Sequence, residues 1–251
     1  MQVDSTGNPA EAPSMPDDRI CGLNAVSALF ARRLDDVIRL YYGDALKAAA
    51  GPLCATLARR RLPYRLLPDD ELERVAGTLH HGGIVAVATP RPIPELDPAK
   101  PPRDKLMLAL DGIGNPHNLG AIARSTAFFG VTSLLLHDTA DQAFPSDAAY
   151  RVAEGGLDQL DLYRTLDLPG ALRALEPHYR TVAATLDPEA VPLSVLPRDR
   201  PVLLVLGNEE FGLLPEVVAA CRRRVRIEGR GAIQSLNVAQ AAAILLHDLS
   251  R

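Results

Sequence analysis

Three short stretches of the sequence combine glycines with polar side chains that can hold a ligand. They are "NLGAIAR" from Asn118 to Arg124, "LGNEEFGL" from Leu206 to Leu213, and "SLNVAQ" from Ser235 to Gln240. Glycine lets the main chain come close to a ligand, while amide, hydroxyl and carboxylate groups orient it. Together these residue types predict one binding or catalytic site, provided that the fold brings the three stretches together.

The first stretch belongs to a longer loop that resembles a nucleotide-binding turn only at its start. "DGIGNPHNLGAIARS", residues 111–125, opens with two glycines one residue apart. A dinucleotide loop needs a third glycine where this chain has Pro116 and His117, and these side chains keep the backbone away from a pyrophosphate. This argues against a nicotinamide enzyme. A structural interpretation also stays open, with Asn118 capping a helix and Arg124 on its solvated face.

The other two stretches also allow structural interpretations. Glu209 and Glu210 precede a predicted helix, where negative charge is favourable near the helix start. Ser235 can cap the last helix and place Asn237 in its first turn. Each stretch is therefore ambiguous by itself, and their joint occurrence carries the functional argument.

Helical and strand patterns alternate along both halves of the chain. In the first part we expect helices at 23–33, 44–61 and 68–77 and strands at 37–42, 64–67 and 83–89. In the second part we expect strands at 106–110, 131–137, 179–186, 201–207 and 224–228, and helices at 118–129, 171–175, 215–222 and from about 235. Apolar strands separated by helices predict a parallel sheet with helices on both faces. Because ligands bind outside the carboxyl ends of such strands, the three polar stretches should converge there.

Composition divides the chain into four segments. The segment 90–105 contains six prolines and predicts an extended connector. We expect a disordered tail at 1–17, a small α/β domain at 18–92, a linker at 93–104 and a larger domain at 105–251. The small domain holds 11 Lys and Arg against 8 Asp and Glu, whereas the whole chain has a formal net charge of −4. This local excess indicates a polyanion partner for the small domain.

The start of the chain and its cysteines bear on location and metal binding. "MQVDSTGNPAEAPSMPDD" lacks the basic and apolar segments of a signal peptide, and no apolar run reaches the roughly 18 residues of a membrane span. The three cysteines are far apart and form no C-x-x-C pair, which argues against disulfides and a zinc cluster. We expect a soluble cytoplasmic protein with reduced thiols and no metal.

The three stretches resemble the motifs of the SpoU/TrmH family of RNA ribose 2′-O-methyltransferases. "NLGAIAR" is similar to the first motif, N-x-G-x-x-x-R, "LGNEEFGL" to the second, and "SLNVAQAAAIL" to the third. The part from "ICGLNAVSAL" to "HHGGIVAVATP" resembles the small ribosomal-protein-like α/β domain that engages RNA in many family members. The resemblance covers nearly the whole folded length.

The resemblance implies a fold, a cofactor and an assembly. It implies a knotted parallel-sheet methyltransferase domain of the trefoil class, S-adenosylmethionine as cofactor, and a homodimer whose active site uses both subunits. Main-chain groups at Gly207, Ile227 and Leu236 would hold the adenosine part of the cofactor. The polar site would consist of Asn118, Arg124, Glu209, Ser235 and Asn237.

The implied reaction is methyl transfer to a ribose 2′-hydroxyl, with Arg124 near the hydroxyl. A guanidinium normally stays protonated and is an awkward base, so Arg124 either acts as the base or stays charged and orients the phosphate. Ser235 and Asn237 would orient Arg124 and the methionine end of the cofactor, and Glu209 would brace its loop. Ribosomal RNA is favoured over transfer RNA because of the extra domain.

Two further points qualify the resemblance. Ile227 is followed by Glu228 and Gly229 where the family usually has Pro and Met, so a non-catalytic RNA-binding relative is an alternative. RNA affinity would come from two groups of basic residues outside the pocket, which are Arg32, Arg33, Arg59, Arg60, Arg61 and Arg65 in the small domain and Arg222, Arg223, Arg224 and Arg226 in the large one.

Overall fold

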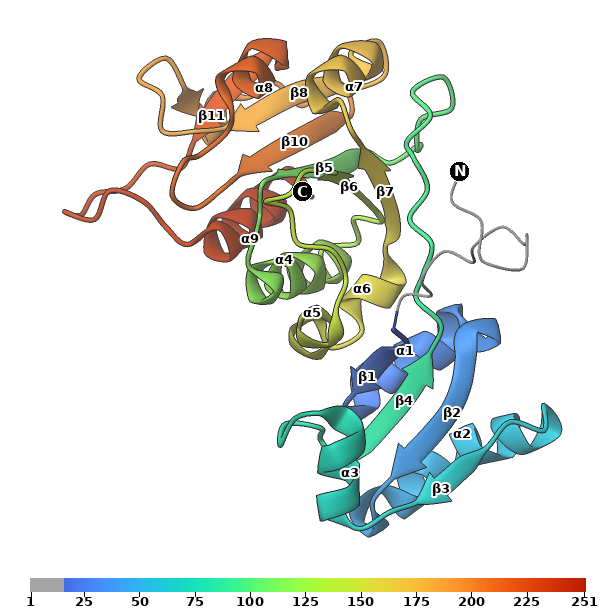
Figure 1. Ribbon diagram of the computed structural model, residues 1–251. Coiled ribbons are helices and arrows are strands. Elements are labelled where there is room, and N and C mark those ends of the chain that lie inside the picture. The colour runs from blue at the N-terminus through green and yellow to red at the C-terminus, as the bar shows by residue number, and fades with distance from the viewer. Residues whose placement is uncertain (1–15) are drawn as a thin grey trace, which may run out of the picture.

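The computed structural model describes residues 16–251 and contains two sheets that use separate parts of the chain (Figure 1). The predicted tail at 1–17 lies outside the described residues except for its last two. An amino-terminal unit with a four-stranded sheet precedes a larger unit with a seven-stranded sheet. The predicted class, an α/β chain with a small domain before a parallel-sheet domain, is confirmed.

The small sheet has the order β1-β4-β2-β3. Strand β4 pairs antiparallel with β1 and β2, and β3 adds to β2 in parallel. Leu29, Leu40 and Leu57 fill the core under this sheet and are fully buried. The elements of this unit are β1 (Asp18–Cys21), α1 (Leu23–Arg32), η1 (Leu34–Asp36), β2 (Val37–Tyr42), η2 (Asp44–Leu46), α2 (Lys47–Arg59), β3 (Tyr64–Leu66), α3 (Asp69–Ala76) and β4 (Ile84–Ala88).

The large sheet is parallel in all its pairings and has the order β7-β6-β5-β10-β8-β11-β9. Strands β5 and β10 lie side by side in its interior, although four other strands come between them in the sequence. The strands are β5 (Leu106–Asp111), β6 (Ser133–His137), β7 (Asp161–Thr165), β8 (Arg180–Ala184), β9 (Val191–Pro192), β10 (Val202–Gly207) and β11 (Arg223–Arg226).

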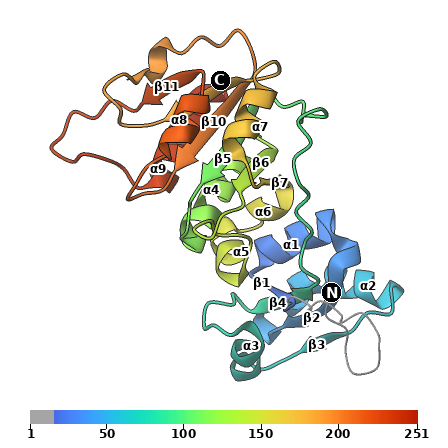
Figure 2. The same cartoon turned by 45° about the horizontal axis from the view of Figure 1, so that its top comes forward.

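Helices cover both faces of the large sheet (Figures 1 and 2). Alternate residues of β5 point to different cores: Leu108 packs with residues of α4 and α9, and Met107 packs with residues of α7 and α8. This is why the strand is apolar throughout instead of alternating with polar residues. The helices are α4 (Pro116–Phe128), α5 (Asp147–Ala153), α6 (Gly156–Gln159), α7 (Leu168–Leu175), α8 (Pro215–Ala220) and α9 (Val238–Leu249), with the short η3 (Leu193–Val195).

Most predicted elements are confirmed, but several short ones were missed. The sequence analysis gave no element at β1, α5, α6, β7 or β9, nor at the short η1 and η3. These are short, and β1 begins where the tail was expected to end. The extended connector also makes contacts that the sequence did not predict, because Leu96 N donates to Arg164 O at 2.8 Å and Arg164 N donates to Pro94 O at 2.9 Å. The middle of the proline-rich segment is thus held against the edge strand β7.

The two units meet through charged groups that are removed from solvent. Arg33, just after α1, forms an ion pair with Asp158 of α6 at 2.9 Å, and the two side chains are 10% and 0% exposed. Arg91 donates to the carbonyl oxygens of Leu157 and Leu160 at 2.8 and 2.6 Å. Arg33 was predicted to contact RNA; this prediction is wrong, because its guanidinium is enclosed between the units.

Candidate active site

The three polar stretches converge because of strand order. Gly207 at the end of β10 is the register partner of Asp111 at the end of β5. The loop before α4 and the loop after β10 therefore leave the sheet from neighbouring points at the carboxyl edge. Helix α9 packs against α4, which brings the third stretch to the same place. The predicted convergence is confirmed.

Side chains from all three stretches form one hydrogen-bonded chain. The amide nitrogen of Asn237 donates to Oδ1 of Asn118 at 3.2 Å, and the amide nitrogen of Asn118 donates to the carboxylate of Glu209. Both functions of the Asn118 amide are thereby used, one to accept and one to donate. This fixes the orientation of the amide and ties together loops that are distant in sequence.

The helix caps differ from the structural interpretations of the sequence. Asn115, not Asn118, caps α4, and its side chain accepts from His117 N at 2.8 Å, with Pro116 at the first helical position. The final helix is capped by Asn237, whose Oδ1 accepts from Ala239 N at 2.9 Å, and not by Ser235. Asn118 is consequently free of capping, and Asn237 uses its oxygen for the cap and its nitrogen for Asn118.

A tight turn carries Glu209 into the site. A Cβ on Gly207 would lie 2.4 Å from the carbonyl carbon of Gly212, so only glycine fits there. The side chain of Asn208 holds the turn: it accepts from Glu210 N and Phe211 N and donates to Gly112 O at 2.8 Å. Asn208 was not among the predicted site residues, although its position directly after an apolar strand and a glycine could have indicated it.

Arg124 lies apart from this polar chain. Its guanidinium forms an ion pair with Glu154 at 2.9 Å, and the two side chains are 56% and 47% exposed. The pair lies in a cleft of about 500 Å³ between the two units, which is lined by residues of α1, α4 and the α5–α6 junction. Within residues 16–251, no hydrogen bond joins Arg124 to Asn118, Glu209 or Asn237. A single subunit thus does not assemble the five predicted polar residues.

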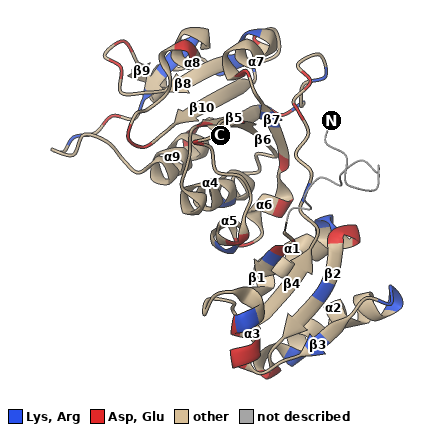
Figure 3. Cartoon of the chain, in the orientation of Figure 1, with Lys and Arg blue, Asp and Glu red and all other residues tan. Residues whose placement is uncertain are grey.

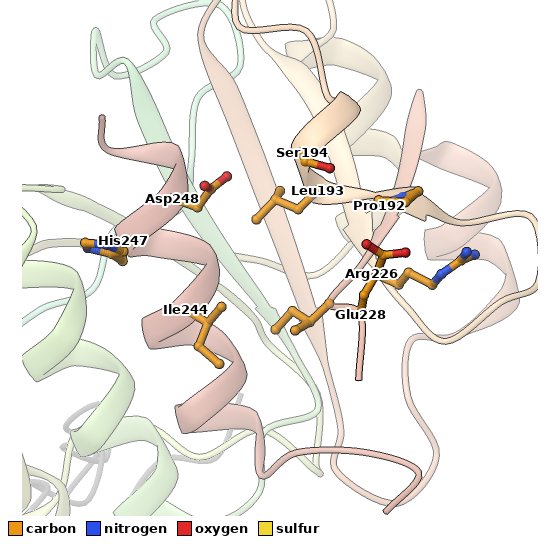
Figure 4. A pocket seen from close by; sticks show the side chains of 9 residues that line it. Pro192, Leu193, Ser194, Arg226, Glu228, Ile244, His247 and Asp248 are labelled. Carbon is orange, nitrogen blue, oxygen red and sulfur yellow. The ribbon is translucent and has the colours of Figure 1, made fainter. Parts of the chain in front are cut away.

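Among the residues predicted to contact the cofactor, Ile227 lines a cavity, whereas Ser235 and Leu236 lie in an exposed segment. Ile227 lines a cavity of about 250 Å³ with Leu193 and Ile244, between the end of β11 and α9 (Figure 4). Ser235 and Leu236 lie in the exposed segment that connects β11 to α9 and extends away from the body of the unit (Figure 2). No main-chain N–H from 228 to 236 donates to another residue of the described chain.

A buried pair of side chains, Asp111 and His137, lies next to the site at the carboxyl ends of β5 and β6. Asp111 Oδ1 and His137 Nδ1 lie 2.7 Å apart at the ends of β5 and β6, and both side chains are almost fully buried. The hydrogen bond to Asp111 raises the pKa of His137, against the lowering effect of burial. The other Asp111 oxygen accepts from Leu214 N at 3.4 Å, so this carboxylate also holds the turn after β10.

The basic residues that were predicted to contact RNA differ in how freely they are exposed on the surface (Figure 3). The end of α2 and the turn after it expose three consecutive arginines, Arg59 to Arg61, of which Arg60 is paired with Asp35. In the large unit, Arg224 binds Asp187 and Glu189 at 2.9 and 2.6 Å, and Arg222 binds Glu176 at 3.4 Å. The second cluster therefore offers less free positive charge than its sequence suggests.

The comparisons with known proteins agree with these motifs. The profile of the SpoU rRNA Methylase family matches residues 105–247, and the profile described as RNA 2′-O ribose methyltransferase substrate binding matches residues 19–94. Within the described chain, no helix is long and apolar enough to cross a membrane.

Two curated relatives and one solved structure illustrate the similarity. The chain is 30% identical over 232 residues to an uncharacterized tRNA/rRNA methyltransferase, YfiF, of Escherichia coli O157:H7, covering 92% of this chain and 67% of the relative. It is 33% identical over 189 residues to the 23S rRNA (guanosine-2′-O-)-methyltransferase RlmB of Acinetobacter baylyi, covering 72% and 75%. An AdoMet-bound rRNA methyltransferase from Sinorhizobium meliloti shares the fold with a TM-score of 0.77 at 23% identity, covering 93% of this chain and 86% of that one. The chain therefore belongs to the SpoU rRNA methylase family.

Proposed function

We propose that this protein transfers a methyl group from S-adenosylmethionine to a ribose 2′-hydroxyl of RNA, with ribosomal RNA as the preferred substrate. The observation that carries the proposal is the hydrogen-bonded chain of Glu209, Asn118 and Asn237, one residue from each family motif. The printed activity of the Acinetobacter relative, guanosine 2′-O-methylation of 23S rRNA, favours the ribose and ribosomal RNA. We place the reaction in the cytoplasm, where bacterial ribosomal RNA is found.

The residues present fit S-adenosylmethionine. Leu193, Ile227 and Ile244 give the cavity beside β11 an apolar wall suited to the face of an adenine ring. The segment 228–236 adjoins Ile227 and carries main-chain donors without protein partners, which suits a ligand with many acceptors. Main-chain groups at Gly207, Ile227 and Leu236 would hold the adenosine part. When bound, the cofactor supplies an electrophilic sulfonium methyl group.

The polar residues would then orient the reacting groups. Glu209 fixes the Asn118 amide, which in turn holds Asn237, so the site is rigid before RNA arrives. Such pre-organisation can contribute up to roughly 7 to 11 kcal/mol of a barrier reduction. Ser235 lies two residues before Asn237 and would help to orient the methionine end of the cofactor.

Arg124 would act on the RNA. We propose that it binds the phosphate next to the target hydroxyl instead of acting as the base, because its exposed guanidinium already binds a carboxylate and has the geometry to bind a phosphate in the same way. Replacing Arg124 by Ala should abolish methylation while leaving S-adenosylmethionine affinity unchanged. Turnover at the wild-type rate in Arg124→Ala would remove the residue from this role.

We further propose a homodimer in which Arg124 of one subunit completes the polar chain of the other. The separation of Arg124 from Asn118, Glu209 and Asn237 within one chain supports this arrangement. Exposed apolar side chains on α4 and α9 also support it, namely Phe128 at 81% and Ile244 at 44% exposure. We also propose the trefoil threading of the large unit; Arg198, which precedes β10, donates to the carbonyl oxygen of Asp248 at the end of α9 at 2.6 Å, so these two segments lie close together.

The proposed function is tested by methylation of defined RNAs. Purified protein with labelled S-adenosylmethionine should transfer label to ribosomal RNA more than to transfer RNA, and nuclease digestion should place the label in 2′-O-methylnucleosides. Label in a base would refute the ribose assignment. Calorimetric titration with S-adenosylmethionine distinguishes this from the non-catalytic alternative, which predicts no heat of binding.

A further inference from the structure

The Arg124–Glu154 pair raises the question of why a glutamate occupies residue 154. Glu154 has φ 45° and ψ 45°, the left-handed region that a non-glycine residue adopts only at a conformational cost. It ends α5 at a place where glycine is the favoured residue. The ion pair with Arg124 is about half exposed, so it contributes little to folding stability. Neither the backbone nor the stability of the fold accounts for this side chain.

The two residues after Glu154 are pressed between the two units. A Cβ on Gly155 would lie 2.8 Å from Cβ of Ala28, on α1 of the small unit. A Cβ on Gly156 would lie 2.8 Å from Cα of Arg124. Residues 154–156 are thus in contact with the small unit on one side and with the backbone of Arg124 on the other. Movement of the small unit would be transmitted through this junction to Arg124.

Glu154 contacts both sides with its own carboxylate. One oxygen binds the Arg124 guanidinium at 2.9 Å, and the other accepts a hydrogen bond from the Asn24 side chain of α1 at 3.4 Å. The cleft around these groups is lined by small residues, among them Ala28, Ala127 and Gly155, which leave room for a ligand group beside the guanidinium. A phosphate entering the cleft would compete with the carboxylate for the same cation.

We propose that Glu154 is a positioning residue of the methyl-transfer reaction, which holds Arg124 in a defined orientation and yields it to an RNA phosphate. The inference rests on the proposed function. Before RNA binds, the carboxylate favours one orientation of the flexible guanidinium over its other rotamers. When RNA binds, the phosphate replaces the carboxylate, and Asn24 retains Glu154 on the side of the small unit. Binding of RNA by the small unit is thereby linked to the state of the arginine.

Two substitutions separate this role from a structural one. Glu154→Gly removes the carboxylate and also relieves the left-handed backbone, so the melting temperature should stay equal or rise. Its kcat should fall roughly tenfold, because the arginine loses its orientation. RNA should bind more tightly, because the phosphate no longer displaces a carboxylate. Glu154→Gln keeps an acceptor for the Asn24 hydrogen bond, so its kcat and RNA affinity should lie between those of the wild type and those of Glu154→Gly. The matched control is Glu73→Gln, because Glu73 is exposed on α3.

A binding cycle tests the exchange without relying on turnover. RNA dissociation constants are measured by filter binding for the wild type, Glu154→Gly, Arg124→Ala and the double variant. Glu154→Gly should tighten binding in the wild-type background and have no effect when Arg124 is absent. Equal effects in both backgrounds, or a kcat like that of Glu73→Gln, would overturn the inference. An inactive wild type whose binding cycle still shows this coupling would refute the proposed function and the role in methyl transfer, and would leave the exchange of Arg124 between Glu154 and an RNA phosphate standing.

Discussion

Asn237 donates its side-chain amide to Oδ1 of Asn118 at 3.2 Å, which joins the head of the last helix to the first turn of α4 across 119 residues of sequence. The same Asn237 caps its own helix with the other end of its amide. The Asn237 side chain therefore both caps the start of α9 and holds this helix against Asn118 of α4. Glu209 completes the connection from the turn after β10.

Replacing Asn237 by Ala should lower turnover roughly a hundredfold, in the range seen when one orienting donor is removed from an active site. Loss of the cap should also cost about 1 kcal/mol of stability. Asn237→Asp keeps the capping oxygen and loses the donor to Asn118, so it should retain stability and lose activity. Steady-state methylation and urea unfolding of both variants provide the measurements. An Asn237→Asp variant with the wild-type rate would contradict the importance of this hydrogen bond.

Replacing Gly207 by Ala should destabilise the protein by about 1–3 kcal/mol, because the added methyl group meets main-chain atoms of Gly212 that cannot move without opening the turn. Thermal unfolding measures the change. Gly51 is a suitable control, because it lies within α2 and a Cβ added there would have no neighbouring atom within 4 Å. Gly51→Ala should raise stability by about 0.5–1 kcal/mol. Equal tolerance of alanine at both positions would contradict the geometry of the turn.

Replacing Asp158 by Ala should destabilise the protein by up to about 3–5 kcal/mol, because the buried Arg33 would lose its nearest carboxylate and keep only Asp36 at 3.6 Å and Asp18 at 3.8 Å. The exposed pair of Arg74 and Asp70 gives the comparison: Asp70→Ala should change stability by less than about 1 kcal/mol. Urea unfolding measures both. Similar small effects would mean that the Arg33–Asp158 pair is open to water and that the two units can separate.

Stability should depend on pH through Asp18. Burial raises the pKa of Asp18 to about 6, against the lowering effect of Arg33. A carboxyl with a raised pKa is favoured in its neutral form, so its contribution to stability is present below about pH 4 and is lost as the pH rises through about 6. Asp18→Asn should therefore unfold at a higher urea concentration than the wild type at pH 8, with the difference vanishing near pH 4. A larger difference at low pH would show that the sign is wrong.

RNA binding should depend on the arginines after α2. Replacing Arg59 and Arg61 by Ala should weaken binding and reduce the slope of log K against log salt concentration by about 1 for each RNA phosphate that these arginines neutralise. The control is Arg164→Ala, because Arg164 is paired with Asp138 at 2.8 Å. This variant should have the same salt slope as the wild type. Filter binding between low and moderate salt provides the measurement. An unchanged slope in the Arg59 and Arg61 variant would move the RNA surface elsewhere.

The sequence by itself determined the fold class and most elements, and it predicted that the three polar stretches meet at one edge of the sheet. Apolar runs such as "LLVLG" predict buried parallel strands because both faces of such a strand are covered, and three motifs predict a common edge because parallel strands end together. The short elements β1, α5, α6, β7 and β9 were not predicted, because a few residues carry too little periodicity.

Only the tertiary structure decided how individual side chains are used. Arg33 and Arg59 look alike in sequence, yet one is enclosed opposite Asp158 and the other is exposed. Asn115, Asn118 and Asn237 are all possible caps, and the backbone of each loop decides which amide is left for the site. The pairing of Arg124 with Glu154 depends on how the two units pack at Gly155 and Gly156. Such contacts arise between distant segments, and local residue patterns do not encode them.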